Sequence, residues 1–162
     1  MSKSQQTQGA SGEQAAEIEL RRLGVYNVAK VPTPIGISRR GTGRFAGWVK
    51  IFYKEKVLGD RRGELANGIS VLAEVKTTRD KNLTWSAFSG VHQPKALDNH
   101  LGLSLLVWVC DTAWSRDVFV MDWNLCKDAG FRPHHGITPE MAVEIAKNTL
   151  AIIDKKSQQC GE

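Results

Sequence analysis

The sequence predicts a single domain of the α/β class, with α+β as the alternative, built around a mixed central β-sheet. Helical and extended patterns follow one another in the order α-β-β-β-β-α-β-β-α over 162 residues. One extended segment, Leu103 to Val109, is almost wholly apolar, as a strand buried on both faces should be. The length suits one domain with one substantial core.

The element boundaries follow from capping residues and apolar spacing. Residues 1–10 are polar and glutamine-rich, so a disordered tail is expected there. A helix is predicted from Ser11, which forms a capping box with Gln14, to Leu23. Further helices are predicted to open at Pro94 and Pro139, and strands are expected at 25–31, 69–78, 103–109 and 118–123. The domain then spans residues 11–155, followed by a flexible tail at 156–162.

Composition excludes membrane and secreted classes. The chain is 41% hydrophobic and 24% charged, which is ordinary for a folded soluble protein. Its longest apolar stretch, Leu101 to Cys110, is about half of the ~20 residues that a membrane helix needs. Three widely spaced cysteines favour a reducing compartment over a disulfide or zinc framework. We therefore expect a cytoplasmic protein with no membrane partner.

Positive charge is concentrated in one segment. The net charge is +5, yet residues 30–62 carry nine basic and two acidic residues. Such a field attracts a polyanion, and the aromatic residues in the same segment can stack on bases. We predict that residues 35–58 form a projecting basic β-ribbon that binds nucleic acid; a solvated basic surface is the alternative. The candidate contacts are Arg39, Arg40, Arg44, Phe45, Trp48, Lys50, Lys54 and Lys56.

The predicted strand at 69–78 carries an unusual charged pair. Successive strand residues alternate between faces, so Glu74 and Lys76 share the face opposite Val71, Ala73 and Val75. A carboxylate and an ammonium group in an apolar strand are costly unless they pair or bind a ligand. A simple salt bridge is the alternative to a functional role.

Asp60 precedes this strand, and a hairpin at Asn67-Gly68 would bring it alongside. Mg²⁺ prefers carboxylate oxygens and neutralises the charge that develops at phosphorus during phosphodiester hydrolysis. A neighbouring lysine can orient or deprotonate the attacking water. The combination indicates a metal-dependent nuclease, with a turn residue as the alternative role for Asp60.

Several short motifs occur in an order typical of one nuclease family. They are Lys30-Val31-Pro32-Thr33-Pro34-Ile35, the spacing from Asp60 to Glu74-x-Lys76, and the pair His92-Gln93. On these motifs the chain, over about residues 11–123, resembles the RecU-type Holliday junction resolvases of the restriction-endonuclease-like superfamily. The Asp60 to Glu74 spacing is one residue longer than in that family. The first helix is shorter and is more similar to that of archaeal-type resolvases, whose catalytic glutamate lies eleven residues before a glycine.

The resemblance implies an active site and a cofactor. It implies a restriction-endonuclease-like core whose site residues are Glu13, Asp60, Glu74, Lys76 and Gln93. Asp60 and Glu74 would be the main Mg²⁺ ligands, with the Val75 carbonyl and with Glu13 through water; Mn²⁺ could substitute. Glu17, one turn along the first helix, is the alternative to Glu13. A backbone contact at the helix start is the alternative role for Gln93.

The resemblance also implies a biological activity. The basic ribbon would be a stalk that enters the centre of a four-way DNA junction. Its arginines would meet phosphates, and Phe45 or Trp48 would stack on bases. A homodimer would nick opposite strands symmetrically in recombination and repair, leaving 5′-phosphate ends and using no small-molecule organic cofactor. The alternatives are another structure- or site-specific endonuclease of this fold and a non-catalytic DNA-binding module.

Other conspicuous residues are assigned to packing. Trp108, Trp114 and Trp123 are expected in the core or at its rim, and Cys110 in a buried strand. Adjacent His134 and His135 diverge on any regular backbone, so we expect a loop there and no metal site.

Overall fold

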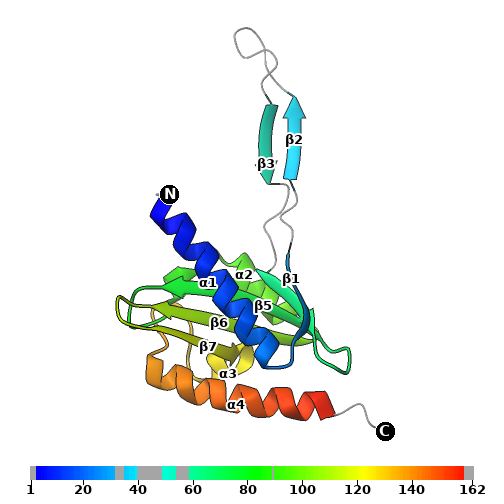
Figure 1. Ribbon diagram of the computed structural model, residues 1–162, viewed down its shortest axis with the longest axis vertical. Coiled ribbons are helices and arrows are strands. Elements are labelled where there is room, and N and C mark those ends of the chain that lie inside the picture. Colours follow the sequence, from blue (N-terminus) through cyan, green and yellow to red (C-terminus); the bar gives the residue numbers. More distant parts are fainter. Residues whose placement is uncertain (1–2, 32–34, 40–48, 54–58, 89, 159–162) are drawn as a thin grey trace.

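The protein is an α/β domain with a five-stranded mixed sheet flanked by helices, together with a separate two-stranded ribbon (Figure 1). The computed structural model describes residues 3–31, 35–39, 49–53, 59–88 and 90–158. The helices are α1 (Lys3–Arg22), α2 (His92–Asn99), α3 (Trp123–Asp128) and α4 (Pro139–Gln158). The strands are β1 (Tyr26–Lys30), β2 (Ile35–Arg39), β3 (Val49–Tyr53), β4 (Arg61–Glu64), β5 (Ser70–Thr78), β6 (Leu103–Asp111) and β7 (Arg116–Asp122). None of the helices in the described ranges combines the length and the apolar character needed to cross a bilayer.

The sheet has the order β1-β4-β5-β6-β7. β5 and β6 run parallel, and the other neighbouring strands are antiparallel. The predicted Asn67-Gly68 turn joins β4 to β5, and Gly68 has the positive φ of +79° that such a turn favours. The predicted mixed sheet is therefore confirmed, and the chain returns from β4 along β5 as expected.

Side chains from β5 alternate between two hydrophobic layers, as the sequence predicts. Val71, Ala73 and Val75 pack in one cluster with Ala16 and Leu20 of α1. Residues of the opposite parity lie on the other face, where Leu72 packs with the α2 and α3 side. The apolar strand β6 is buried from Leu103 to Cys110, so it forms the centre of both layers.

Helix α4 covers the β7 edge of the sheet. Ala142 and Ile145 near its start belong to one core cluster, and Ile153 near its end belongs to the other. Between them the buried Thr149 hydroxyl accepts a hydrogen bond from the Asp122 backbone N–H at 2.7 Å. Leu150, on the same helix, is 44% exposed.

Helix α1 is longer than predicted. It begins at Lys3, so the expected disorder is wrong for residues 3–10. Helix α4 continues to Gln158, so the expected flexible C-terminal tail is wrong for residues 156–158. Ser11 does not cap the helix, because it lies in the middle of α1. Its hydroxyl accepts a hydrogen bond from Arg116 at 2.7 Å. Gly12 allows α1 to approach β5: a Cβ there would lie 2.1 Å from the Thr77 hydroxyl oxygen. Tertiary contacts thus extend a helix that local signals would start later.

The three tryptophans that the sequence places in the core or at its rim have different outcomes. Trp108 and Trp123 are buried, as predicted, but Trp114 is 97% exposed at the turn between β6 and β7. Trp123 begins the short helix α3 instead of ending a strand, because the Asp122 carboxylate accepts hydrogen bonds from the N–H groups of Asn124 and Leu125 and caps that helix.

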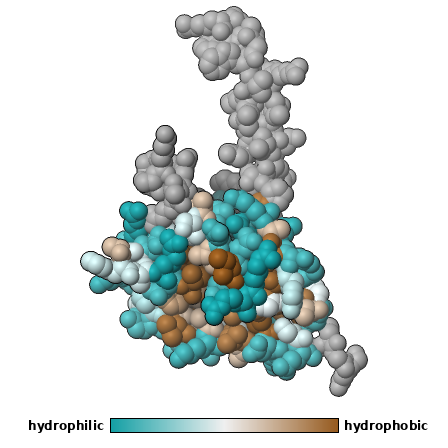
Figure 2. All heavy atoms as spheres, viewed as in Figure 1, coloured by the Kyte–Doolittle hydropathy of each residue, from teal (hydrophilic) through white to brown (hydrophobic). Residues whose placement is uncertain are grey.

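The surface in Figure 2 shows hydrophobic side chains among hydrophilic ones. Ile18 of α1 and Val143 of α4 are among the partly exposed apolar residues.

The predicted ribbon is present as far as the structure describes it. β2 and β3 pair antiparallel, with Ile35 opposite Tyr53 and Arg39 opposite Val49. Figure 1 shows this hairpin standing away from the five-stranded sheet. Residues 40–48, which connect the two strands, lie outside the described residues.

The free edge of the sheet is irregular. β1 pairs with β4, but the register shifts between Tyr26 and Ala29. Asn27 has a positive φ of 52° at that point, and its side-chain amide donates to the Glu64 carboxylate. Four of the five β1 residues are exposed.

Candidate active site

Asp60 is held against β5 by two hydrogen bonds. Its backbone N–H donates to the Ala73 carbonyl at 2.9 Å, and its carboxylate Oδ2 accepts from the Val75 N–H at 2.9 Å. Gly59 precedes it with a φ of +78°, a conformation that glycine adopts without strain. The chain therefore turns at Gly59 and delivers the Asp60 carboxylate to the point where β4 begins.

Glu74 and Lys76 form the predicted pair on β5. The Lys76 ammonium donates to Glu74 Oε1 at 2.6 Å and to Gln93 Oε1 at 3.1 Å. Glu74 is fully buried and Lys76 is nearly so. The ammonium group also lies 4.9 Å from the centre of the Phe88 ring, a cation–π contact that further fixes it. Nothing in the sequence pattern marks Phe88, which directly follows a short 3-10 helix at Trp85–Ala87.

Glu74 has an electrostatic environment unlike that of a surface glutamate. Burial and, to a smaller extent, the negative charge of Asp60 together raise the pKa of its carboxyl to about 7 against the opposing effect of Lys76. The repulsion means that the two carboxylates lie near each other. Two acidic groups that are forced together in this way are typical of a site that binds a cation.

The residues around Glu74 fit a divalent metal ion. Its second oxygen, Oε2, is buried without a hydrogen-bond partner among the described residues, which is costly unless a ligand is bound there. Asp60 supplies a second carboxylate. The Val75 carbonyl faces the same side of β5 as its N–H, which contacts Asp60. Hard oxygen donors of this kind suit Mg²⁺.

Glu13 does not join this pair of carboxylates. In the part of the chain that the structure describes, no three acidic, histidine or cysteine side chains gather in a group that could hold a metal. Glu13 pairs instead with Lys30 at 2.9 Å and with Arg61 at 3.0 Å. Partial burial works to raise its pKa, but the hydrogen bonds from these two cations outweigh burial and hold the pKa below its ordinary value. The three-carboxylate set expected from the sequence is thus a two-carboxylate set here.

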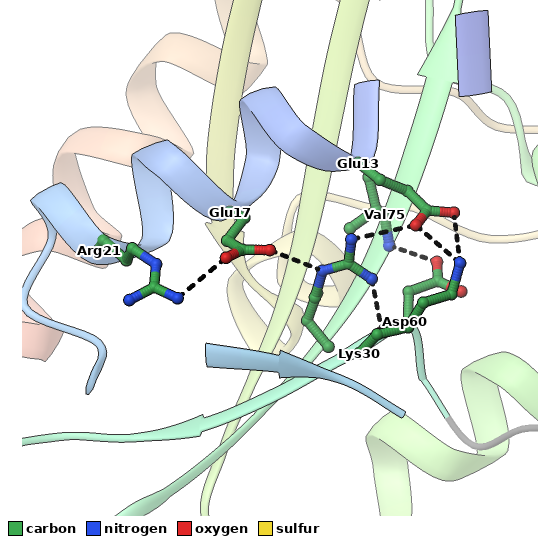
Figure 3. Close-up of polar contacts among 7 residues, drawn as sticks. Glu13, Glu17, Arg21, Lys30, Asp60 and Val75 are labelled. Carbon is green, nitrogen blue, oxygen red and sulfur yellow. Dashed lines mark hydrogen bonds and ion pairs between the residues drawn. The ribbon is translucent and has the colours of Figure 1, made fainter. Parts of the chain in front are cut away.

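Arg61 is the centre of the network that captures Glu13. Figure 3 shows Glu13 and Glu17 directed from α1 toward one guanidinium group, which belongs to Arg61. The Arg61 Nε lies 3.6 Å from Glu17 Oε2. The same guanidinium group donates a hydrogen bond to the Asp60 carbonyl at 3.1 Å. Glu17, the alternative first-helix acid, is therefore engaged as well. Arg61 is 6% exposed, so it ties α1 to the start of β4 and is not available to DNA as its charge alone suggests.

Replacing Arg61 by alanine should lower the free energy of unfolding by about 2 kcal/mol. The change removes a buried cation and leaves Glu13 and Glu17 short of a partner, although both are partly exposed and keep Lys30 and Arg21. Urea unfolding followed by circular dichroism measures the loss. Arg22→Ala is the matched control, since its exposed pair with Glu19 should contribute at most about 0.5 kcal/mol. Equal losses in the two variants would contradict a structural role for Arg61.

The predicted nucleic-acid contacts lie mainly beyond the described residues. Arg39 ends β2 and Lys50 lies in β3, so both are in the ribbon. The others, Arg40, Arg44, Phe45, Trp48, Lys54 and Lys56, fall outside the described residues. The structure therefore brings together Asp60, Glu74, Lys76 and Gln93, and places Glu13 in a neighbouring ion network.

Comparisons with known proteins do not identify the chain. No protein-family model matches it, and neither does any curated protein sequence. Among solved structures, one described as "Crystal structure of SSO0001" is similar at a TM-score of 0.29 and 16% identity. The match covers 87% of this chain, and this chain spans 59% of the length of that structure. A similarity at this level assigns neither a fold family nor a function.

Proposed function

We propose that this protein is a metal-dependent endonuclease that cuts four-way DNA junctions. The observation that carries the proposal is the Asp60 carboxylate beside a buried Glu74, which pairs with an ordered lysine through Oε1 and leaves Oε2 without a hydrogen-bond partner among the described residues. The basic ribbon of β2 and β3 supports a nucleic-acid substrate. A restriction-endonuclease-like core is part of the same proposal.

The metal would be held by Asp60, Glu74 and the Val75 carbonyl. When bound, Mg²⁺ supplies Lewis-acid stabilisation of a phosphate that is under attack. The protein's own contribution is to hold these oxygens in place before substrate arrives, which β4, β5 and the Asp60–Val75 hydrogen bond accomplish.

Lys76 would act on the water that attacks phosphorus. Glu74, Gln93 and the Phe88 ring hold its ammonium in one position. From there it can donate a hydrogen bond to the water or to a phosphate oxygen, and so keep the nucleophile in line with the leaving group. Gln93 would then be a positioning residue for Lys76.

The ribbon would recognise the shape of the DNA. A hairpin that stands away from the sheet (Figure 1) is suited to the opening at the centre of a four-way junction, where phosphates converge and basic side chains are favoured. Cutting both strands symmetrically requires two sites, and hence a homodimer.

A cleavage assay tests the proposal directly. The full chain should nick a synthetic four-way junction on opposing strands in Mg²⁺ or Mn²⁺, leave a linear duplex of the same sequence uncut, and show no cutting in EDTA. Denaturing gels with labelled strands give the cut positions, and ligation shows whether 5′-phosphates remain. Tight junction binding without cutting in either metal would overturn the nuclease and favour a DNA-binding module. Equal cutting of duplex would favour a less selective endonuclease.

Replacing residues 36–52 with a short Gly-Ser turn should abolish the preference for junctions over duplex. The affinity for junctions should fall by roughly tenfold or more, because the change removes several phosphate contacts. The thermal unfolding midpoint should stay unchanged, since the ribbon forms its own two-stranded sheet. Competition binding between junction and duplex measures the preference. Retention of full junction preference would contradict the proposed role of the ribbon.

A further inference from the structure

A basic cavity lies on the same face of the sheet as Glu74 and Lys76. It has a volume of about 340 Å³ and is bounded by β4, β5 and α2. Leu72 and Ala96 form its apolar part, and Arg62, His92, Lys95 and His100 surround it. None of the described residues that line it is acidic.

The two permanent charges at this cavity have no ion-pair partner among the described residues. Arg62 and Lys95 are exposed, and neither belongs to any of the ion pairs formed among the described residues. This sets Arg62 apart from its neighbour Arg61, which points to the opposite face and is neutralised by Glu13 and Glu17. The alternation along β4 thus gives one structural arginine and one arginine that is open to an anion.

The cavity is in line with the candidate active site. Leu72 and Glu74 are two residues apart on β5 and face the same side, which places them roughly 6.6 Å apart along the strand. His92 precedes Gln93, the partner of Lys76. Nucleotides in one strand of a duplex advance by roughly 3.4 Å each along the helix axis. A DNA strand that runs along β5 with its reacting phosphate at Glu74 and Lys76 would therefore place another phosphate, about two nucleotides away, at the cavity.

We propose that this cavity binds a backbone phosphate of the DNA strand that is cut, through Arg62 and Lys95. The proposal rests on the proposed function and adds a second contact point to it. Two contacts on one strand, at the cavity and at the reacting phosphate, fix the direction in which that strand crosses the site, which one contact cannot do.

The test is the salt dependence of junction binding. Fluorescence anisotropy of a labelled four-way junction is recorded in EDTA, where no cutting is expected, across a range of salt concentrations. The double variant Arg62→Gln, Lys95→Gln should reduce the slope of log K against log [salt] by about 1, as expected for one lost phosphate contact. The matched control is Arg132→Gln, Lys147→Gln, which removes the same charge at two exposed residues that do not line the cavity. That control should keep the wild-type slope.

Each outcome decides the inference separately from the nuclease proposal. A wild-type slope in the Arg62/Lys95 variant, or an equal fall in the control, would overturn the inference even if junction cleavage is found. A selective fall in a protein that never cuts DNA would support a DNA phosphate contact at the cavity and overturn the nuclease. Titration with inorganic phosphate, followed by NMR of the Ala96 amide, distinguishes a phosphate of DNA from a small free phosphate. Millimolar binding of inorganic phosphate together with an unchanged salt slope for the junction would assign the cavity to a small free phosphate instead. Lys95→Gln alone, a change at an exposed position, should give part of the same fall if the double variant folds poorly.

Discussion

Junction cleavage should fall by roughly a thousandfold when Asp60 is replaced by asparagine. A metal ligand supplies several kcal/mol of transition-state charge stabilisation, and each 1.36 kcal/mol is a factor of ten in rate. The protein should remain folded, because the asparagine side-chain oxygen can still accept the hydrogen bond from the Val75 N–H. Single-turnover cleavage of a labelled junction measures the rate. Asp128→Asn, a change at an exposed residue of α3, is the control and should cut at the wild-type rate.

The same variant has a second readout that needs no DNA. Asp60 contributes to the raised pKa of Glu74 through charge repulsion, so removing its charge should lower the pKa of Glu74 below about 7. Titration of the Glu74 side-chain carboxyl by carbon-detected NMR measures this. An unchanged pKa together with near-normal, metal-dependent cleavage would show that Asp60 and Glu74 do not share a site.

Glu74→Gln should make the protein more stable at pH 8 by about 3 kcal/mol while abolishing cleavage. The Glu74 pKa is about 7 in the folded protein against an ordinary value of 4.5. Each pH unit of that difference is worth about 1.36 kcal/mol. A glutamine has no proton to lose, and its side-chain oxygen can still accept from the Lys76 ammonium.

The sign of the pH dependence follows from proton binding. Between pH 4.5 and about 7 the folded protein holds the Glu74 proton more tightly than the unfolded chain does, so stability falls as pH rises through that range and then levels off. The stability difference between Glu74→Gln and wild type should therefore be near zero at pH 4.5 and greatest above pH 7. Urea unfolding at a series of pH values measures it. Glu144→Gln, at an exposed position of α4, should follow the wild-type curve; a Glu74→Gln curve that does so too would contradict the raised pKa.

The strand that carries Glu74 and Lys76 shows what local sequence can predict. The period of two along β5 places both side chains on one face, and the Asn67-Gly68 turn brings Asp60 beside them. Both features depend on backbone geometry within about fifteen residues. They could be predicted because alternation and turn chemistry act over that range.

Glu13 and Trp114 show where such reasoning fails. The partner of Glu13, Arg61, is 48 residues away in the chain, and no spacing rule pairs an acid on a helix with an arginine on a distant strand. Trp114 is hydrophobic enough to suggest burial, yet it occupies the turn between β6 and β7, where it is exposed. Ion pairing and turn position are settled by the assembled fold, which local patterns do not contain.

The irregularity in β1 has a consequence for how copies of the protein can meet. A straight, unpaired outer strand offers its peptide groups as a template on which a neighbouring chain can add a further strand. Here the register shift between Tyr26 and Ala29 and the left-handed backbone of Asn27 break the regular spacing of those peptide groups. Another β-strand therefore cannot form a continuous ladder of hydrogen bonds with β1. Self-association by the addition of a further strand to β1 is therefore disfavoured, which protects this edge of the sheet against amyloid-like stacking.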